Sequence, residues 1–326
     1  MSGSHRRDAD GAARRPGGRA KLLLMIAAIA VAVGGYLGFT VARPSSTPDT
    51  LSTAADTYLG VYLPGIPHSY QPVRDFVGRT GVRPNVLLYY SSWWEPFREK
   101  FADKAAAHHA IPLVQINPEH VRLSDIAAGR YDTYILSFAS DVRAYHRPVI
   151  VGFGHEMNAQ WSKWGYRHAK PATFVAAWRH IVSQFRMAGA RNVTWLWTVN
   201  VIDAHANSLP PDRWWPGDKY VNWVGIDGYY RRPAWRFSAL FGPTIKAVHR
   251  LTGDPILISE AGVAPRAGKA AKISNLFAGI KAYGLLGVVW FDAVAHQDWR
   301  INNRAAIEAF HRAAVGTDTG QRAAAP

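Results

Sequence analysis

Residues 148–158 read Pro-Val-Ile-Val-Gly-Phe-Gly-His-Glu-Met-Asn, a short apolar run that leads into a carboxylate, Glu156. Residues 255–262 read Pro-Ile-Leu-Ile-Ser-Glu-Ala-Gly and place Glu260 in a similar context. Apolar runs of this length that are rich in Val and Ile predict buried strands. We therefore expect each glutamate to lie where a buried strand ends and a loop begins.

Eight β-rich runs occur along the chain, separated by stretches with helical periodicity. That periodicity is clearest in 170–188 and 273–282, where one face is apolar. Repeated strand and helix units predict an α/β fold, and eight of them fit a (β/α)8 TIM barrel. A doubly wound open sheet gives a similar count, but no Gly-rich phosphate loop follows the first run. The expected strands are 58–64, 85–92, 111–117, 148–155, 193–200, 221–229, 255–260 and 287–292.

The two glutamates follow the fourth and seventh expected strands. The active site of such a barrel is built at the carboxyl ends of its strands, so both acids can reach one cleft. Glycoside cleavage with retention requires one protonated acid and one ionised carboxylate about 5–5.5 Å apart. Glu156, beside His155 and Asn158, is the candidate acid/base, and Glu260, on an apolar strand, is the candidate nucleophile. The alternative for either glutamate is a helix cap or an ion pair with one of the arginines.

Three motifs resemble those of a known family. His155-Glu-Met-Asn158, followed by Trp161 and Trp164-Gly165, resembles the acid/base motif of glycoside hydrolase family 26, which includes β-mannanases and related endo-glycanases. Residues 216–229 are similar to that family's sixth strand, and residues 258–262 to its nucleophile strand. The resemblance covers roughly residues 58–311.

The resemblance implies a retaining mechanism with Glu156 as acid/base and Glu260 as nucleophile. It also implies that Tyr229 hydrogen-bonds the nucleophile and that Trp290 floors the sugar subsite before the cleavage point. Gly152 and Ala159 depart from the residues common in the family, Arg and Gly. The residues expected to contact substrate are His155, Asn158, Trp161, Trp164, Tyr229, Trp290 and Trp94, the last because it follows the second strand.

The amino-acid composition limits the chemistry and the binding partners that the chain can have. Cysteine is absent, which excludes disulfides and thiolate chemistry. No metal-binding spacing of histidines and carboxylates occurs, so we expect neither a metal nor a cofactor. The formal charge is +15, and because residues 1–50 hold seven basic and three acidic residues, +11 remains on 51–326. No nucleic-acid signature accompanies this charge, which favours a solvated basic surface, or else an anionic glycan or membrane partner. The oligomeric state is not indicated.

Residues 22–41 form an uncharged apolar stretch long enough to cross a bilayer. Basic residues precede it, so the positive-inside rule predicts a cytoplasmic amino terminus and an extracytoplasmic barrel. A cleaved signal segment and a secreted barrel are the alternative. The expected organisation is a basic cytoplasmic tail (1–21), a transmembrane helix (22–41), a flexible linker (42–56), the glycoside hydrolase barrel (57–312) and a disordered tail (313–326).

These observations together predict a membrane-anchored retaining glycosidase that hydrolyses a β-linked polysaccharide, mannan-like or of the cell envelope. Two alternatives remain open at this point. A barrel that binds or scaffolds glycan without catalysis would not need both glutamates. A transglycosylase would use the same residues with a drier acceptor site.

Overall fold

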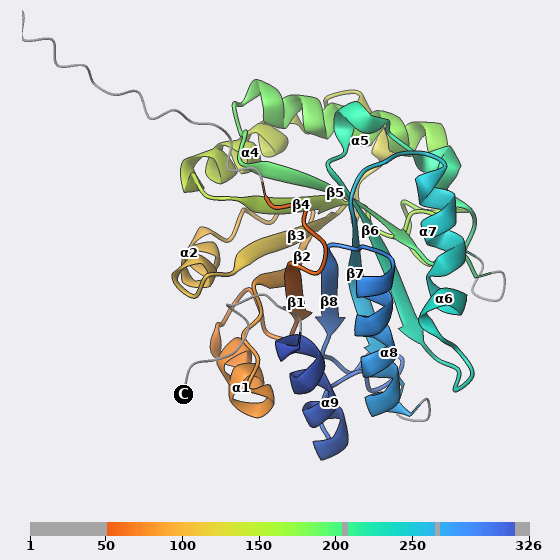
Figure 1. The fold of residues 1–326 in the computed structure, drawn as a ribbon. Helices are drawn as coiled ribbons and strands as arrows, with labels where there is room; N and C mark the ends of the chain where they lie inside the picture. Colours follow the sequence, from red (N-terminus) through yellow and green to blue (C-terminus); the bar gives the residue numbers. More distant parts are fainter. Residues whose placement is uncertain (1–50, 204–207, 265–267, 317–326) are drawn as a thin grey trace, which may run out of the picture. The chain divides into compact units, whose positions relative to one another are not determined.

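The computed structural model describes residues 51–203, 208–264 and 268–316, and in them eight parallel strands close into a barrel (Figure 1). Each strand pairs with its neighbours in sequence, and β8 pairs with β1. This confirms the predicted (β/α)8 barrel. The strands are β1 (Tyr58–Tyr62), β2 (Val86–Ser92), β3 (Ile111–Asn117), β4 (Val149–Phe153), β5 (Val193–Asn200), β6 (Trp223–Tyr230), β7 (Ile256–Val263) and β8 (Gly287–Phe291).

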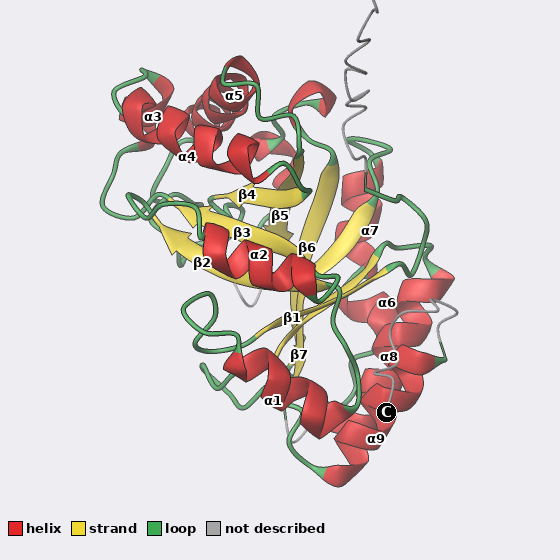
Figure 2. Cartoon of the chain, turned by 90° about the vertical axis from the view of Figure 1, so that its left-hand side faces the viewer, coloured by secondary structure: helices red, strands yellow, loops and turns green. Residues whose placement is uncertain are grey.

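Helices lie outside the ring of strands, as Figures 1 and 2 show from two directions. The apolar face predicted in 170–188 belongs to α5, whose Phe174, Trp178 and Phe185 are buried. The helices are α1 (Gln71–Thr80), α2 (Glu99–Ala107), α3 (Leu123–Ala127), α4 (Asp132–Tyr145), α5 (Pro171–Met187), α6 (Phe237–Leu240), α7 (Gly242–His249), α8 (Lys269–Ala282) and α9 (Arg304–Val315), with 3₁₀ turns η2 (Pro211–Trp214) and η3 (Asp218–Tyr220).

Strand side chains divide between two apolar clusters because successive residues of a strand point to opposite faces. One cluster, which includes Leu88, Leu113 and Val289, fills the barrel interior. The other, which includes Trp290 and Phe310, packs the strands against the helices. Residues near the carboxyl ends that share the inward parity therefore point into the mouth of the barrel.

Two strand ends differ from the sequence-based expectation. β4 ends at Phe153, so Glu156 lies three residues beyond the strand. β7 continues to Val263, so Glu260 lies within the strand and not at its end. The extension is explained by pairing, since Tyr229 and Tyr230 of β6 continue to pair with Gly262 and Val263.

The expected segments 1–21 and 22–41 and most of the linker lie outside the described residues. In the ranges that are described, no helix combines the length and apolar character that a membrane span requires. At the other end, α9 runs to Val315, three residues past the expected end of the barrel domain, and the rest of the expected tail, 317–326, is not described.

Candidate active site

Glu156 and Glu260 line the same cavity of about 350 Å³ at the mouth of the barrel. Both carboxylates are buried, with relative exposures of 8% and 5%. The strands between them are linked in register, because Asn200 pairs with Asp227 and Asp227 pairs with Glu260. The fold thus brings together two acids that are about a hundred residues apart in the sequence.

The carboxylate of Glu156 accepts two hydrogen bonds from N–H donors. Asn200 Nδ2 donates to Oε1 and Trp161 Nε1 donates to Oε2, each at 2.6 Å. Burial raises the pKa of Glu156, and these two hydrogen bonds oppose the rise. Glu156 is therefore a carboxyl that gains a proton more readily than an exposed one.

The backbone that carries Glu156 adopts an uncommon conformation. Gly154 and Glu156 have φ angles of 56° and 55°, in the left-handed region that non-glycine residues seldom occupy. The Glu156 amide donates to the carbonyl of Thr198 at 2.9 Å, which ties this turn to β5. Left-handed backbone at a non-glycine residue costs about 1–3 kcal/mol and is concentrated at functional sites.

The carboxylate of Glu260 accepts hydrogen bonds from two tyrosines. The Tyr90 hydroxyl donates to Oε1 and the Tyr229 hydroxyl to Oε2. Burial, followed by the nearby charge of Glu156, raises the pKa of Glu260 to about 7, although the tyrosine hydrogen bonds lower it. The two glutamates thus differ in their donors, amide and indole N–H groups for one and phenol hydroxyls for the other.

A third carboxyl, Asp227, lies beside Glu260 and is completely buried. Ser259 Oγ donates to its Oδ1 at 2.6 Å, and its Oδ2 has no hydrogen-bond partner among the described residues. Burial and then the charges of Glu260 and Glu156 raise the pKa of Asp227 well above its usual value. These effects favour the neutral acid at this position.

A single family match spans the whole site, from Glu156 to Glu260. Residues 130–318 match the family described as Glycosyl hydrolase family 26. The chain belongs to glycosyl hydrolase family 26. This range includes β4 to β8, the strands that supply or precede both buried glutamates.

The chain is also similar in sequence to curated proteins. Endoglucanase H of Acetivibrio thermocellus is 29% identical over 268 residues, which are 77% of this chain and 30% of that protein. A beta-1,3-xylanase of Vibrio sp is 26% identical over 107 residues, 32% of this chain and 22% of that protein. The chain thus spans less than a third of the length of these relatives.

Solved structures show the same fold. The catalytic domain of the Bacillus sp. JAMB-750 GH26 endo-beta-1,4-mannanase superposes with a TM-score of 0.62 at 14% identity, covering 82% of this chain and 89% of that one. The YdhT protein from Bacillus subtilis gives a TM-score of 0.59 at 15% identity, covering 78% and 85%. At these identities the likeness establishes the barrel alone.

Two residues of the acid motif, Asn158 and Trp164, are buried and form hydrogen bonds to the backbone around the site. Asn158 is fully buried, and its amide binds the Asn200 backbone and the Leu209 carbonyl. Trp164 is buried as well, and its Nε1 donates to the His155 carbonyl at 2.7 Å. Their polar atoms fix the strand-end loops and neither residue lines the cavity of the two glutamates, so sugar contact by Asn158 and Trp164 stays a prediction.

The imidazole of His155 is half-buried next to the site. Its Nδ1 lies 3.0 Å from Asn117 Oδ1, and its ring lies 5.3 Å from that of Tyr90. Burial lowers the pKa of His155 to about 4, which keeps the ring neutral. His155 thus adds a neutral polar group close to Tyr90, which itself binds Glu260.

Trp290, expected to floor a subsite, is not among the residues that line the cavity of the two glutamates. It is fully buried, its Nε1 donates to the Trp299 carbonyl, and its ring packs against Phe310 of α9. The physical reason is strand parity, since Val289 points into the barrel interior and its neighbour must point outward. Phe291, the next residue, lines the cavity instead, together with Trp299.

The exposed tryptophans have different positions. Trp161, 48% exposed, lines the cavity that holds both glutamates. Trp94, 57% exposed, has a left-handed φ of 81° and packs edge-on against Tyr131 and Tyr134, and it is not among the residues that line that cavity. Trp94 therefore stays a prediction for an outer subsite.

Several residues around the two glutamates were not among the site residues expected from the sequence. Tyr90, Asn200, Asp227, Arg231, His296 and Trp299 bind or surround the two glutamates. Asp227 lies two residues before Tyr229 on the same face of β6, and Asn200 lies at the end of β5, so strand alternation could have indicated both. Arg231, His296 and Trp299 lie in loops, for which periodicity gives no signal. In the ranges that the structure describes, no group of three His or acidic side chains is placed to hold a metal ion.

Proposed function

We propose that the chain is a retaining glycoside hydrolase that cleaves β-linked polysaccharide by double displacement. The observation that carries the proposal is one cavity lined by two buried carboxylates with different hydrogen-bond donors. Glu156 is the acid/base and Glu260 the nucleophile. Retaining glycosidases require this pair of roles.

In the first step, the Glu260 carboxylate attacks the anomeric carbon while Glu156 gives its proton to the glycosidic oxygen, whose bond to that carbon breaks. A covalent glycosyl ester on Glu260 and a free alcohol result. In the second step, Glu156 takes a proton from water, the water oxygen attacks the anomeric carbon, and the ester bond to Glu260 breaks. Each residue ends in its starting protonation state.

The surroundings of the two acids support this division. The hydroxyls of Tyr90 and Tyr229 favour an ionised Glu260, which a nucleophile requires. Burial disfavours ionisation of either glutamate, and repulsion between their charges favours a pair in which only one is ionised; we assign the remaining proton to Glu156. In this state Glu156 holds the proton that the leaving oxygen needs.

The substrate backbone is proposed from the relatives, whose names include an endoglucanase, two beta-1,3-xylanases and a mannan endo-1,4-beta-mannosidase. The names of the xylanases and the mannosidase state a β linkage, those of the endoglucanase and the mannosidase state endo action, and the sugar differs among them. Endo action on a β-linked glucan, xylan or mannan is therefore the proposal, with the exposed Trp161 as a platform for a sugar ring. Whether the acceptor is water or a second sugar decides between hydrolysis and transglycosylation, and the products of one digest distinguish them.

The location stays a proposal that rests on residues 22–41 and the basic residues before them. In this proposal the barrel lies outside the cytoplasm. Fusing a reporter that is active only in the cytoplasm after the carboxyl terminus gives no signal if this orientation is correct, and full signal if it is wrong.

The test of function is release of reducing ends from β-mannan, β-glucan and xylan by the full chain and by Glu260→Gln. We expect activity on at least one polymer and a loss of at least about a thousandfold in the variant. Equal activity of the two chains would remove Glu260 from the mechanism. No activity on any polymer would favour a glycan-binding barrel.

A further inference from the structure

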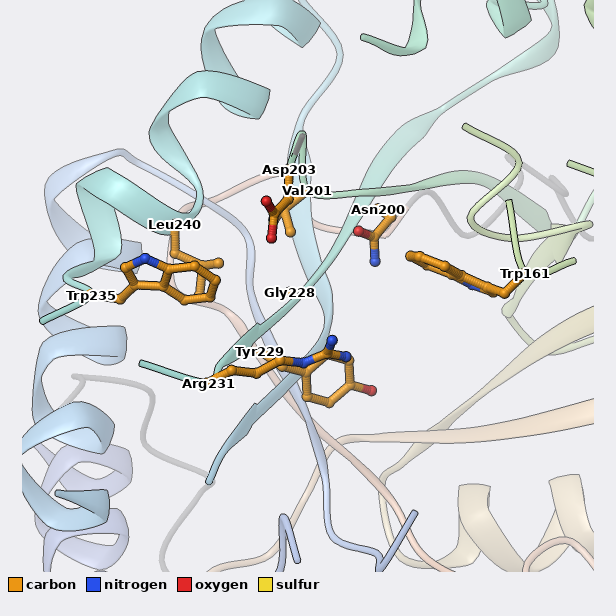
Figure 3. Close-up of a pocket in the computed structure, with 9 residues that line it drawn as sticks. All are labelled: Trp161, Asn200, Val201, Asp203, Gly228, Tyr229, Arg231, Trp235 and Leu240. Atoms are coloured by element: carbon orange, nitrogen blue, oxygen red, sulfur yellow. The ribbon is translucent and has the colours of Figure 1, made fainter. Parts of the chain in front are cut away.

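Arg231 follows the last residue of β6 and lies in the cavity that holds the two glutamates. Its Cζ is 5.9 Å from the centre of the Tyr229 ring and 6.0 Å from the Trp299 ring. Figure 3 shows the side chain extended along Tyr229, with the guanidinium over the phenol ring. Two aromatic faces thus hold the cation in place without using its N–H donors.

Within the described ranges, the Arg231 guanidinium has no carboxylate at ion-pair distance and donates none of the side-chain hydrogen bonds found there. Other arginines of the barrel rim are paired, Arg79 with Asp292 and Arg300 with Asp298. Arg231 also lines the smaller adjoining cavity, beside Trp161 and Trp235. Its donors therefore face space that a substrate can enter.

An effect on the pKa of Glu156 does not account for the position of Arg231. The positive charge of Arg231 lowers the pKa of Glu156, but less than the hydrogen bonds from Asn200 and Trp161 do. An exposed charge at the mouth of a cleft also has a weak effect through solvent. A role toward a ligand explains both the aromatic support and the free donors.

We propose that Arg231 binds a carboxylate carried by the sugar next to the cleaved bond, so that the substrate class is a β-linked glycan containing uronic acid. This rests on the proposed function. The planar fork of a guanidinium matches a carboxylate with two parallel hydrogen bonds, and stacking leaves that fork available. The charge of +11 on residues 51–326 favours the approach of such a polyanion.

Two oligosaccharide pairs test the proposal, because each differs only at carbon 6 of the sugar. β-1,4-mannuronan and β-1,4-mannan hexasaccharides form the first pair, and β-1,4-glucuronan and cellohexaose form the second. Binding is measured by calorimetry on the full chain carrying Glu260→Gln, which prevents turnover. We expect at least one uronate to bind about tenfold more tightly than its neutral partner.

Arg231→Gln should remove this preference, and the uronate should then bind no better than the neutral sugar. Arg232→Gln is the matched control, because Arg232 is the next residue, stacks on Trp235 at 5.2 Å and is not among the residues that line either cavity. It should leave the preference intact. Arg231 is exposed, so both variants should unfold at the temperature of their parent.

Equal or weaker binding of both uronates, absence of any binding, or an equal loss for both members of a pair in Arg231→Gln would overturn the inference. The proposed function is judged separately by hydrolysis with Glu260 restored. Cleavage of a neutral polymer without preference for its uronate leaves the hydrolase proposal standing and this inference rejected. Selective binding of a uronate with no cleavage of any polymer would support this inference and reject the hydrolase proposal.

Discussion

The indole of Trp161 donates a 2.6 Å hydrogen bond to Oε2 of Glu156, although the tryptophan itself is 48% exposed. One side chain thus forms part of the cavity wall and also binds the proposed acid. This contact connects the shape of the cleft to the protonation of Glu156. A sugar ring that packs on Trp161 is thereby also close to the group that must protonate the leaving oxygen.

Trp161→Phe should shift the pH dependence of activity. Loss of the indole N–H removes a donor that lowers the pKa of Glu156, so that pKa rises. The acid then stays protonated to higher pH, and the basic limb of kcat/KM moves upward. The measurement is a pH profile on a soluble polysaccharide. Trp94→Phe is the control, and a matching upward shift in that variant would contradict the explanation.

Tyr229→Phe should reduce kcat/KM by about tenfold to a hundredfold, the range expected for loss of one hydrogen bond to a charged group. The hydroxyl also lowers the pKa of Glu260, so its loss raises that pKa and moves the acidic limb to higher pH. Tyr90→Phe should act in the same direction because its hydroxyl binds the other oxygen. An unchanged acidic limb in both variants would show that these tyrosines do not set the ionisation of Glu260.

Asp227→Asn should make stability less dependent on pH. An acid whose pKa is raised by folding binds its proton more tightly in the native state, so the wild-type chain loses stability as pH rises above about 4. Asparagine cannot ionise and keeps a similar shape. The unfolding temperature, measured by circular dichroism from about pH 4.5 to about pH 7.5, should therefore fall less steeply with pH in the variant. Parallel curves would mean that Asp227 is already ionised in the native protein.

Gly152→Ala should destabilise the barrel by about 1–3 kcal/mol. A Cβ at this position would lie 2.0 Å from Gln115 Oε1, in the barrel interior. Gly78→Ala in α1 is the control, because nothing lies within 4 Å of the added carbon. Urea unfolding should show a smaller total loss in Gly152→Ala with Gln115→Ala than the sum of the two single variants. Strict additivity would contradict the predicted clash.

Much of the fold could be predicted because strands in a barrel are buried on both faces. The bounds of β3 and β5 agree with the predicted runs, since polar or turn residues flank those apolar stretches. The end of β7 could not be predicted in this way. Its last three residues are small or apolar, and only pairing with Tyr229 and Tyr230 of β6 extends the strand past Glu260.

The site was predictable where a motif is local and not where it depends on side-chain direction. Glu156 and Glu260 could be placed from the strands before them. The position of Trp290 could not be predicted, because adjacent strand residues point to opposite faces of the sheet. Trp290 points outward into the core between strands and helices, and Phe291 points inward and lines the cavity. Tyr90 contacts Glu260 across 170 residues of sequence, a contact that only barrel closure creates.

Azide rescue distinguishes the acid/base role of Glu156 from the nucleophile role of Glu260. Glu156→Ala and Glu260→Ala are given a β-glycoside with a good leaving group and sodium azide, and the anomeric configuration of the glycosyl azide is read by NMR. We expect a β-azide from Glu156→Ala, where azide replaces water in the second step, and an α-azide from Glu260→Ala, where azide replaces the nucleophile. The reversed configurations, or an azide product from neither variant while both remain folded, would contradict this division of roles.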